Sequence, residues 1–305
     1  MILQDIGIAI VAPGGCALDG GQVASGLREL EAHGAIVHNY YDHDRRFQRF
    51  GGTDDARLAA LHEAARNPEV QVIMALRGAY GVSRILDRVD FGLLASSGKI
   101  LTGYSDITSL HMGLLAMEGA MSYAGPMLYG DFGKPEPVAY TLESFARCLR
   151  GPTHTVEGEG AGNPVLDVSG PVWGGNLAIL SHLCGTPYLP HVEGGILFIE
   201  DINEHPYRIE RILIQLLNCG VLARQKALVF GAFTDYRLGP SDNGYDFEAM
   251  LAWLRERVPV PILTGLPFGH VPVRATIPVG AHARLASDGE RFTLTMSGYP
   301  TLPHA

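Results

Sequence analysis

Short apolar runs alternate with helical patterns through the first half of the chain. Residues 6–12 form an apolar run, residues 23–30 carry apolar side chains at helical spacing, and an apolar run begins again at residue 35. A helical pattern over 53–66 and an apolar run over 70–76 repeat this alternation. Repeated strand-then-helix spacing is typical of a parallel sheet covered by helices, with functional loops at its carboxyl edge.

The pattern changes between about residues 150 and 170, where a polar, glycine-rich segment replaces the apolar runs. Beyond this segment the predicted strands alternate more regularly and the turns lie closer together. Strands are predicted over 165–168, 195–199, 227–230, 277–285 and 292–296, and helices over 176–184, 206–219 and 246–257. We therefore expect an α/β domain over residues 1–150 and a smaller β/α domain over residues 165–305.

Composition narrows the classes of function. The formal net charge of −9 argues against nucleic-acid binding, which needs a basic face, so small molecules are the expected partners. The 4 cysteines are scattered without a C-x-x-C pair, which predicts neither a zinc site nor a disulfide framework and favours a reducing compartment. The start has no basic n-region, and no window holds about 18 uninterrupted apolar residues. We expect a cytoplasmic protein without a membrane span.

A serine lies between a predicted strand and a predicted helix. The apolar run that reaches Leu101 is followed by Leu110 and Leu114 at helical spacing, which places Ser105 at the turn. In an α/β scaffold a hydroxyl there projects from the strand end, and the free N–H groups of the new helix face developing negative charge. Capping the helix just before Asp106 is the alternative role, and this segment alone leaves both open.

The sequence Arg77-Gly-Ala-Tyr-Gly directly follows the apolar run over 70–76. It lacks the G-x-x-x-x-G-K-[ST] pattern and its lysine, which argues against a phosphate-binding loop. Two roles remain for it. One is to supply backbone N–H groups beside Ser105, and the other is a tight turn in which glycine adopts a positive φ.

An activated serine needs a base, and the base needs an orienting acid. Glu200 ends the apolar run over 195–199, so a carboxylate stands at a strand terminus. A structural charge near a helix start, or a pair with Arg208, is the alternative role for Glu200. Competing acids follow closely, namely Asp201, Glu204 and Glu210. His270 lies on a loop after a predicted strand over 261–263 and is the candidate base, although a lone histidine is often structural.

The order serine, glutamate, histidine matches that of the α/β-hydrolases. The sequence Gly103-Tyr-Ser-Asp-Ile nevertheless lacks the second glycine of the G-x-S-x-G pattern, and the two-domain organisation also differs. These residues alone therefore leave the hydrolase class open.

Five motifs together resemble the LD-carboxypeptidase family, the muramoyltetrapeptide carboxypeptidases of bacterial cell-wall recycling. They occupy residues 77–81, 103–108, 172–177, 196–211 and 264–270, and they cover nearly the whole chain in order. The resemblance implies a serine peptidase with Ser105 as nucleophile, His270 as general base and later acid, and Glu200 as orienting carboxylate. It also implies an amidotransferase-like α/β N-terminal domain and a swivelling β/α C-terminal domain that meet at the active site. Family members commonly form homodimers, and neither a metal nor a cofactor is expected.

The resemblance further implies an oxyanion hole formed by the backbone N–H of Asp106 and one from Ala79 or Gly78. The family usually has glycine where this chain has Ala79. The oxyanion hole needs only the N–H group, but alanine is strained there if φ is positive.

The expected reaction is hydrolysis of the amide between the L-centre of meso-diaminopimelate, or lysine, and the terminal D-Ala of murein tetrapeptides. Arg77 and Arg208 are candidates for binding the terminal carboxylate. Trp173 and Asn176 are candidates for lining the pocket, with packing in the domain core as the alternative for Trp173. Two alternative functions remain for the chain. One is a microcin-immunity-type hydrolase of peptidyl or aminoacyl adenylates, and the other is a catalytically silent binding protein for sugars or peptides.

Overall fold

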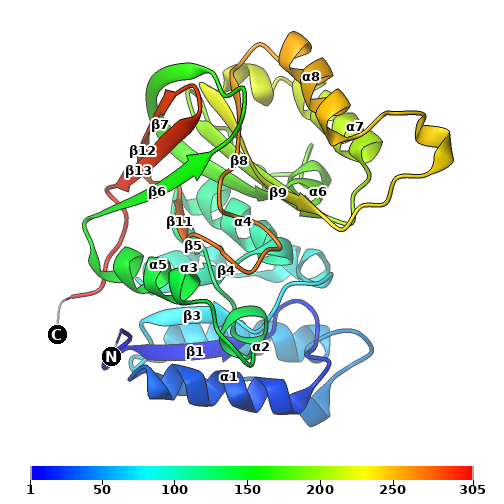
Figure 1. Cartoon of the computed structure of the whole chain (residues 1–305). Helices are drawn as coiled ribbons and strands as arrows, with labels where there is room; N and C mark the ends of the chain where they lie inside the picture. The colour runs from blue at the N-terminus through cyan, green and yellow to red at the C-terminus, as the bar shows by residue number, and fades with distance from the viewer. Residues whose placement is uncertain (1, 304–305) are drawn as a thin grey trace.

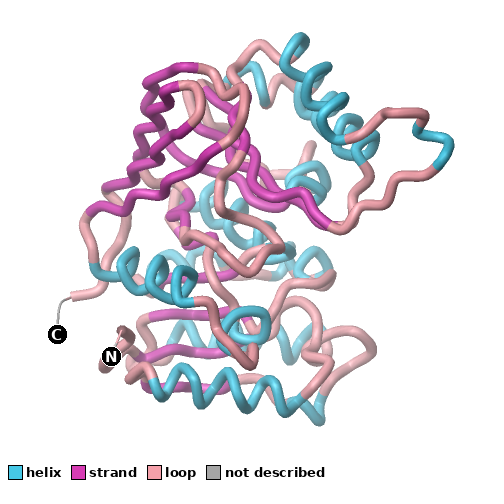
Figure 2. The backbone as a smooth tube through the Cα atoms, in the orientation of Figure 1, coloured by secondary structure: helices cyan, strands magenta, loops and turns pink. Residues whose placement is uncertain are grey.

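The computed structural model describes residues 2–303, which form two units, each built on its own sheet (Figure 1). The strands of the first sheet are β1 (Gly7–Val11), β2 (Ile36–Asn39), β3 (Val72–Ala75), β4 (Ile100–Gly103), β5 (Ser122–Ala124) and β11 (Ile277–Val279). The helices of this unit are α1 (Gly20–Ala32), α2 (Asp54–Arg66), α3 (Phe91–Ser96), α4 (Thr108–Glu118) and α5 (Ala139–Arg150). The helices lie on both faces of the sheet (Figure 2).

The first sheet has the order β11-β5-β4-β3-β1-β2, and all its pairs are parallel except β11 with β5. Because β1, β3 and β4 are neighbours, the loops that follow them meet at one edge of the sheet. Those loops begin at residues 12, 76 and 104. They include the segment Arg77-Gly-Ala-Tyr-Gly and Ser105, which the sequence singles out.

The second sheet has the order β10-β9-β8-β7-β12-β13-β6. Its strands are β6 (Thr153–Glu159), β7 (Val165–Asn176), β8 (Ile196–Ile202), β9 (Ala227–Thr234), β10 (Ile262–Thr264), β12 (His282–Asp288) and β13 (Arg291–Ser297), and its helices are α6 (Leu177–His182), α7 (Pro206–Asn218) and α8 (Phe247–Arg257). The pairs from β7 to β10 are parallel and the others are antiparallel. The loop between β9 and α8 extends away from this unit (Figure 2). The predicted fold class, a parallel-sheet N-terminal domain and a separate β/α C-terminal domain, is confirmed.

The domain limits expected from sequence differ from the structure in two places. Strand β6 lies in the segment expected to link the domains, yet it forms the edge of the second sheet. The single strand predicted over 277–285 is two strands in different sheets, because Gly280 turns the chain at φ +91°. Strand β11 therefore completes the first sheet, although it lies far into the second half of the chain.

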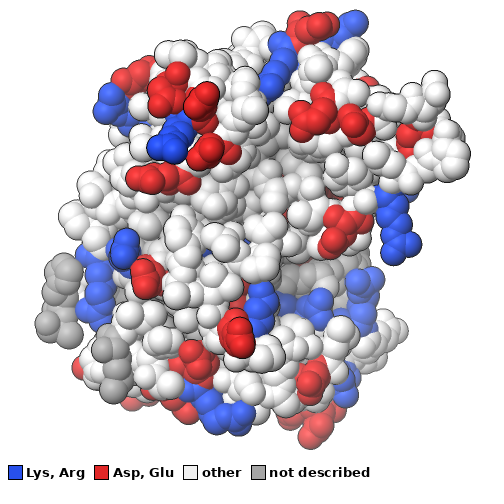
Figure 3. Space-filling model, viewed as in Figure 1, with Lys and Arg blue, Asp and Glu red and all other residues white. Residues whose placement is uncertain are grey.

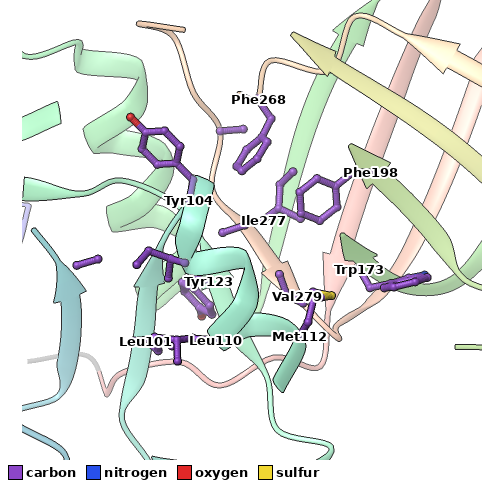
Figure 4. Close-up of a cluster of buried hydrophobic side chains, with 14 of the residues drawn as sticks. Leu101, Tyr104, Leu110, Met112, Tyr123, Trp173, Phe198, Phe268, Ile277 and Val279 are labelled. Atoms are coloured by element: carbon purple, nitrogen blue, oxygen red, sulfur yellow. The ribbon is translucent and has the colours of Figure 1, made fainter. Parts of the chain in front are cut away.

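The two units pack closely where α4 meets β7. The backbone N–H of Asn176 donates to Oγ1 of Thr108 at 3.1 Å, and a Cβ placed on Gly175 would lie 2.6 Å from that oxygen. Buried side chains from both units continue across this contact, including Tyr104 and Met112 on one side and Phe268 on the other (Figure 4). On the face shown in Figure 3 the surface is hollowed between the units, and Lys and Arg side chains gather on the wall formed by the first unit.

Within residues 2–303, no helix has the length and apolarity needed to cross a membrane.

Candidate active site

Ser105 follows β4 in a strained backbone conformation. Its φ of +63° lies in the left-handed region that residues other than glycine seldom adopt, and such strain is typical of functional turns. A Cβ on Gly103 would lie 2.9 Å from Cγ1 of Ile107, so the glycine lets the new helix pack against the strand end. Helix α4 begins at Thr108 after a 3₁₀ turn, and neither of these elements has a side-chain cap. The capping role considered for Ser105 is therefore absent.

The loop after β3 lies directly against this serine. A Cβ on Gly78 would lie 2.7 Å from Oγ of Ser105 and 3.3 Å from the backbone N of Asp106. Among residues 2–303, the backbone N–H groups of Gly78, Ala79 and Asp106 have no hydrogen-bond acceptor. The carboxylate of Asp106 accepts from the N–H of Val82 at 2.8 Å and so holds the loop to the serine turn. The loop that carries the free N–H groups of Gly78 and Ala79 thus lies against the serine turn, which carries the free N–H of Asp106.

Two features of this loop have physical consequences. Ala79 has a φ of +58°. Alanine is strained at such a positive φ, so the strain anticipated from the sequence is present. Burial raises the pKa of Asp106 to about 7, because the backbone donors and nearby arginines only partly offset the loss of solvent. The N–H groups are therefore displayed by backbone that is costly to hold in place.

The histidine and its acid form a close pair. Nδ1 of His270 lies 2.7 Å from Oε2 of Glu200, whose side chain is 0% exposed, whereas the histidine side chain is 17% exposed. The pairing of β8 with β9 shifts register between Ile199 and Asp201, so Glu200 stands at a bulge, a device that re-aims side chains beside active sites. The amide Nδ2 of Asn176 donates to Oε1 of Glu200 at 3.2 Å. The carboxylate is therefore oriented from both sides.

The competing acids have other partners. Asp201 accepts hydrogen bonds from the N–H of Ala178 and from the amide of Asn176, and burial followed by the charge of Glu200 raises its pKa to about 6. Glu204 lies 3.7 Å from the guanidinium of Arg208. Glu210 accepts from the hydroxyl of Tyr245 at 2.7 Å. Of the four acids, Glu200 is the one that meets His270.

His270 and Ser105 come from different units and approach each other at Tyr104. The rings of Tyr104 and His270 meet edge to face with centroids 5.2 Å apart, and Tyr104 directly precedes the serine. Among the described side chains, the hydrogen-bond partner of His270 is Glu200, and no hydrogen bond joins His270 to Ser105. Contacts of this kind are commonly loose before substrate binds and tighten in the reacting complex.

The four side chains expected at the substrate pocket have different surroundings. Arg77 donates to the carbonyl of Cys16 at 3.3 Å, and its guanidinium lies 5.4 Å from the ring centroid of Tyr129, beside the glycine loop. Arg208 is exposed and lines a cavity of about 770 Å³ beyond the carboxyl ends of β8 and β9. Asn176 is buried and serves Glu200, so it is not a pocket wall.

The expectation that Trp173 lines the pocket is wrong. The side chain is 1% exposed, and its indole N–H donates to Oε1 of Gln225 at 2.8 Å inside the second unit. Strand β7 turns this side chain toward the core, where it forms part of the buried cluster in Figure 4. Packing in the domain core, the alternative considered from sequence, is what the structure contains.

Two residues that the sequence did not single out complete this region. Asp131 and Arg274 form a buried ion pair that contacts Tyr104 and the His270 loop. No spacing or motif signals a charged pair separated by so much chain. Among the residues described, no group of three or more His, Cys, Asp or Glu side chains could hold a metal ion.

Comparison with known proteins decides the family. The model of the LD-carboxypeptidase N-terminal domain matches residues 8–125, and that of the LD-carboxypeptidase C-terminal domain matches residues 169–285. The chain belongs to the LD-carboxypeptidase family.

Three relatives illustrate the range of this family. The crystal structure of a muramoyltetrapeptide carboxypeptidase from Oxalobacter formigenes superposes with a TM-score of 0.93 at 46% identity, covering 97% of this chain and 100% of the other. A murein tetrapeptide carboxypeptidase of Pseudomonas aeruginosa is 32% identical over 93% of this chain and 94% of its own. The microcin C7 self-immunity protein of Escherichia coli is 27% identical over 80% of this chain and 79% of its own. The resemblance found in the motifs is thus confirmed as membership.

Proposed function

We propose that this LD-carboxypeptidase family member is a serine carboxypeptidase whose triad is Ser105, His270 and Glu200. The observation that carries the proposal is the 2.7 Å contact between the buried carboxylate of Glu200 and Nδ1 of His270. That contact assigns Nδ1 as the donor and leaves the other ring nitrogen free to accept a proton. The strained serine and three free backbone N–H groups stand at the end of the neighbouring unit.

The proposed reaction follows from these positions. His270 takes the proton of Ser105 as the hydroxyl oxygen attacks the scissile carbonyl, and Glu200 stabilises the imidazolium that forms. The oxyanion is bound by the N–H groups of Asp106 and of Gly78 or Ala79, and one such donor typically lowers the barrier by about 2.7–4 kcal/mol. His270 then protonates the leaving amine, and water releases the acyl group by the reverse sequence.

The proposed substrate is a murein tetrapeptide that loses its terminal D-Ala from meso-diaminopimelate or lysine. The names of the Oxalobacter and Pseudomonas relatives support this substrate class. We assign the terminal carboxylate to Arg77, because it adjoins the glycine loop that touches Ser105, whereas Arg208 is already neighboured by Glu204. The proposal places the enzyme in the cytoplasm, in cell-wall recycling, as a homodimer without metal or cofactor.

The test is release of D-Ala from a murein tetrapeptide, followed by mass spectrometry, in the native chain and in Ser105→Ala. We expect loss of turnover in Ser105→Ala without loss of folding, and full turnover in Ser96→Ala, an exposed serine that serves as matched control. Retained turnover in Ser105→Ala would remove the nucleophile assignment. An enzyme that spares the tetrapeptide but cleaves an aminoacyl sulfamoyl adenylate would instead belong with the microcin C7 self-immunity proteins.

A further inference from the structure

Arg274 lies in the connection between β10 and β11, four residues after His270, with 2% of its side chain exposed. Its Nε donates to the carbonyl of Gly269 at 2.7 Å, and its Nη2 donates to the carbonyl of Val271 at 2.9 Å. These carbonyls stand on either side of His270 in the chain. One planar guanidinium therefore fixes the backbone on both sides of the imidazole, which a lysine ammonium is not shaped to do.

The same guanidinium also contacts the unit that carries the serine. Its Nη1 donates to Oδ1 of Asp131 at 2.5 Å, and Asp131 belongs to the π-helical turn η5 (Leu128–Phe132) of the first unit. Its central carbon lies 3.7 Å from the ring centroid of Tyr104. Since Tyr104 directly precedes Ser105, the guanidinium contacts backbone or side chains next to both reacting groups.

We propose that Arg274 is a positioning residue that sets the distance between the imidazole of His270 and the hydroxyl of Ser105. This inference rests on the proposed triad. Glu200 fixes the histidine through its ring but belongs to the same unit, whereas Arg274 joins the histidine loop to the serine unit through Asp131 and Tyr104.

A purely structural role would not require the planar guanidinium of Arg274. Buried ion pairs are often replaced by apolar residues without loss of stability, so the pair with Asp131 does not by itself explain an arginine here. The two carbonyl contacts around His270 do require the fork. Because a misplacement of about 1 Å can lower a rate by about 10²-fold, loss of the fork acts on kcat and leaves the affinity for substrate largely unchanged.

Two variants test the proposal. Arg274→Lys keeps a positive charge beside Asp131 but removes the fork. The double variant Asp131→Asn with Arg274→Met removes both charges, so that neither is left buried and alone. Arg284→Met, which removes an exposed arginine paired with Asp167, is the matched control.

Each variant is measured in three ways: kcat and KM for D-Ala release, the rate of Ser105 labelling by a fluorophosphonate, and thermal unfolding. We expect both test variants to fold, to lose about 10²-fold in kcat and in labelling rate, and to keep KM within about threefold. The Arg284→Met control keeps all three values.

Wild-type labelling and kcat in either folded test variant would overturn the proposal, even if its Tm falls, because the arginine would then contribute only to stability. If Arg274→Lys does not fold, the double variant decides. Labelling also separates this proposal from the proposed function. A native chain that is labelled but releases no D-Ala contradicts the substrate assignment and leaves the positioning test valid, whereas a native chain that resists labelling contradicts the triad.

Discussion

The substitution Glu200→Gln tests the acid of the proposed triad with almost no change in shape. The native carboxylate accepts from Nδ1 of His270 at 2.7 Å and from Nδ2 of Asn176 at 3.2 Å. A glutamine that presents its NH₂ group to the histidine forces Nδ1 to accept, which leaves the other ring nitrogen protonated and unable to act as a base. A glutamine in the opposite orientation directs its NH₂ group at the NH₂ group of Asn176.

That second orientation cannot be rescued by turning Asn176. The Oδ1 atom of Asn176 already accepts from the N–H of Ile179 as the cap of α6, and its Nδ2 donates to Asp201. The first orientation therefore keeps both hydrogen bonds but holds His270 in the wrong tautomer, and the second loses the buried hydrogen bond to Asn176.

The size of the effect follows from the charge that is removed. The imidazolium formed during catalysis loses its carboxylate partner, and unit charges about 4 Å apart at an effective dielectric constant of about 20 attract by about 4 kcal/mol. Since about 1.36 kcal/mol corresponds to a factor of ten in rate, kcat is expected to fall about 10³-fold.

The assay is D-Ala release at a saturating concentration of tetrapeptide, and the far-ultraviolet circular dichroism spectrum checks folding. Glu210→Gln is the matched control, since this acid bonds the hydroxyl of Tyr245 and does not touch His270. A Glu200→Gln enzyme within about tenfold of native kcat would refute the electrostatic argument.

Three further changes are informative. Ala79→Gly relieves an alanine at φ +58° and is expected to add about 0.5 kcal/mol to the free energy of unfolding with kcat retained; a lower Tm would contradict the strain argument. Arg77→Gln should raise KM about 10–100-fold at nearly constant kcat. If KM for a tetrapeptide amidated at its terminal carboxylate also differs between the native and the variant enzyme, carboxylate binding by Arg77 is contradicted. Burial lowers the pKa of His111 from 6.5 to about 4, so the unfolded chain binds more protons than the folded chain between these values. The free energy of unfolding should therefore fall by about 3 kcal/mol as the pH is lowered from 6.5 to 4. Urea titrations in which His111→Gln shows the same fall in the free energy of unfolding would remove this explanation.

Much of the first unit could be predicted from sequence, because its signals are local. The helix expected over 53–66 is α2, where Thr53 caps the first turn through the N–H of Ala56. An apolar run and a helical pattern meet at Ser105 and so predict its place at the end of β4. A strand terminus, a loop and the family motifs point to Glu200 and His270, and the structure brings these two side chains into contact.

The remainder depends on contacts between distant segments. Nothing in the apolar pattern around 277–285 tells that a turn at Gly280 sends its two halves to different sheets. Tryptophan is a residue type that often lines pockets, and only the pairing of β7 with β8 shows that Trp173 points into the core of the second unit. Arg274 lies four residues after the candidate base, but its partner Asp131 is separated by most of the second unit.

The crossing of β11 into the first sheet bears on how the protein is made. A ribosome releases the serine turn early, but the edge partner of β5 is not synthesised until residues 277–279 emerge. Until then the half-built sheet has an open edge, which is prone to pair with other chains. The histidine and arginine at 270 and 274 are translated just before that strand. Nascent chains should therefore acquire hydrolytic competence only after residues 277–279 have emerged and paired with β5.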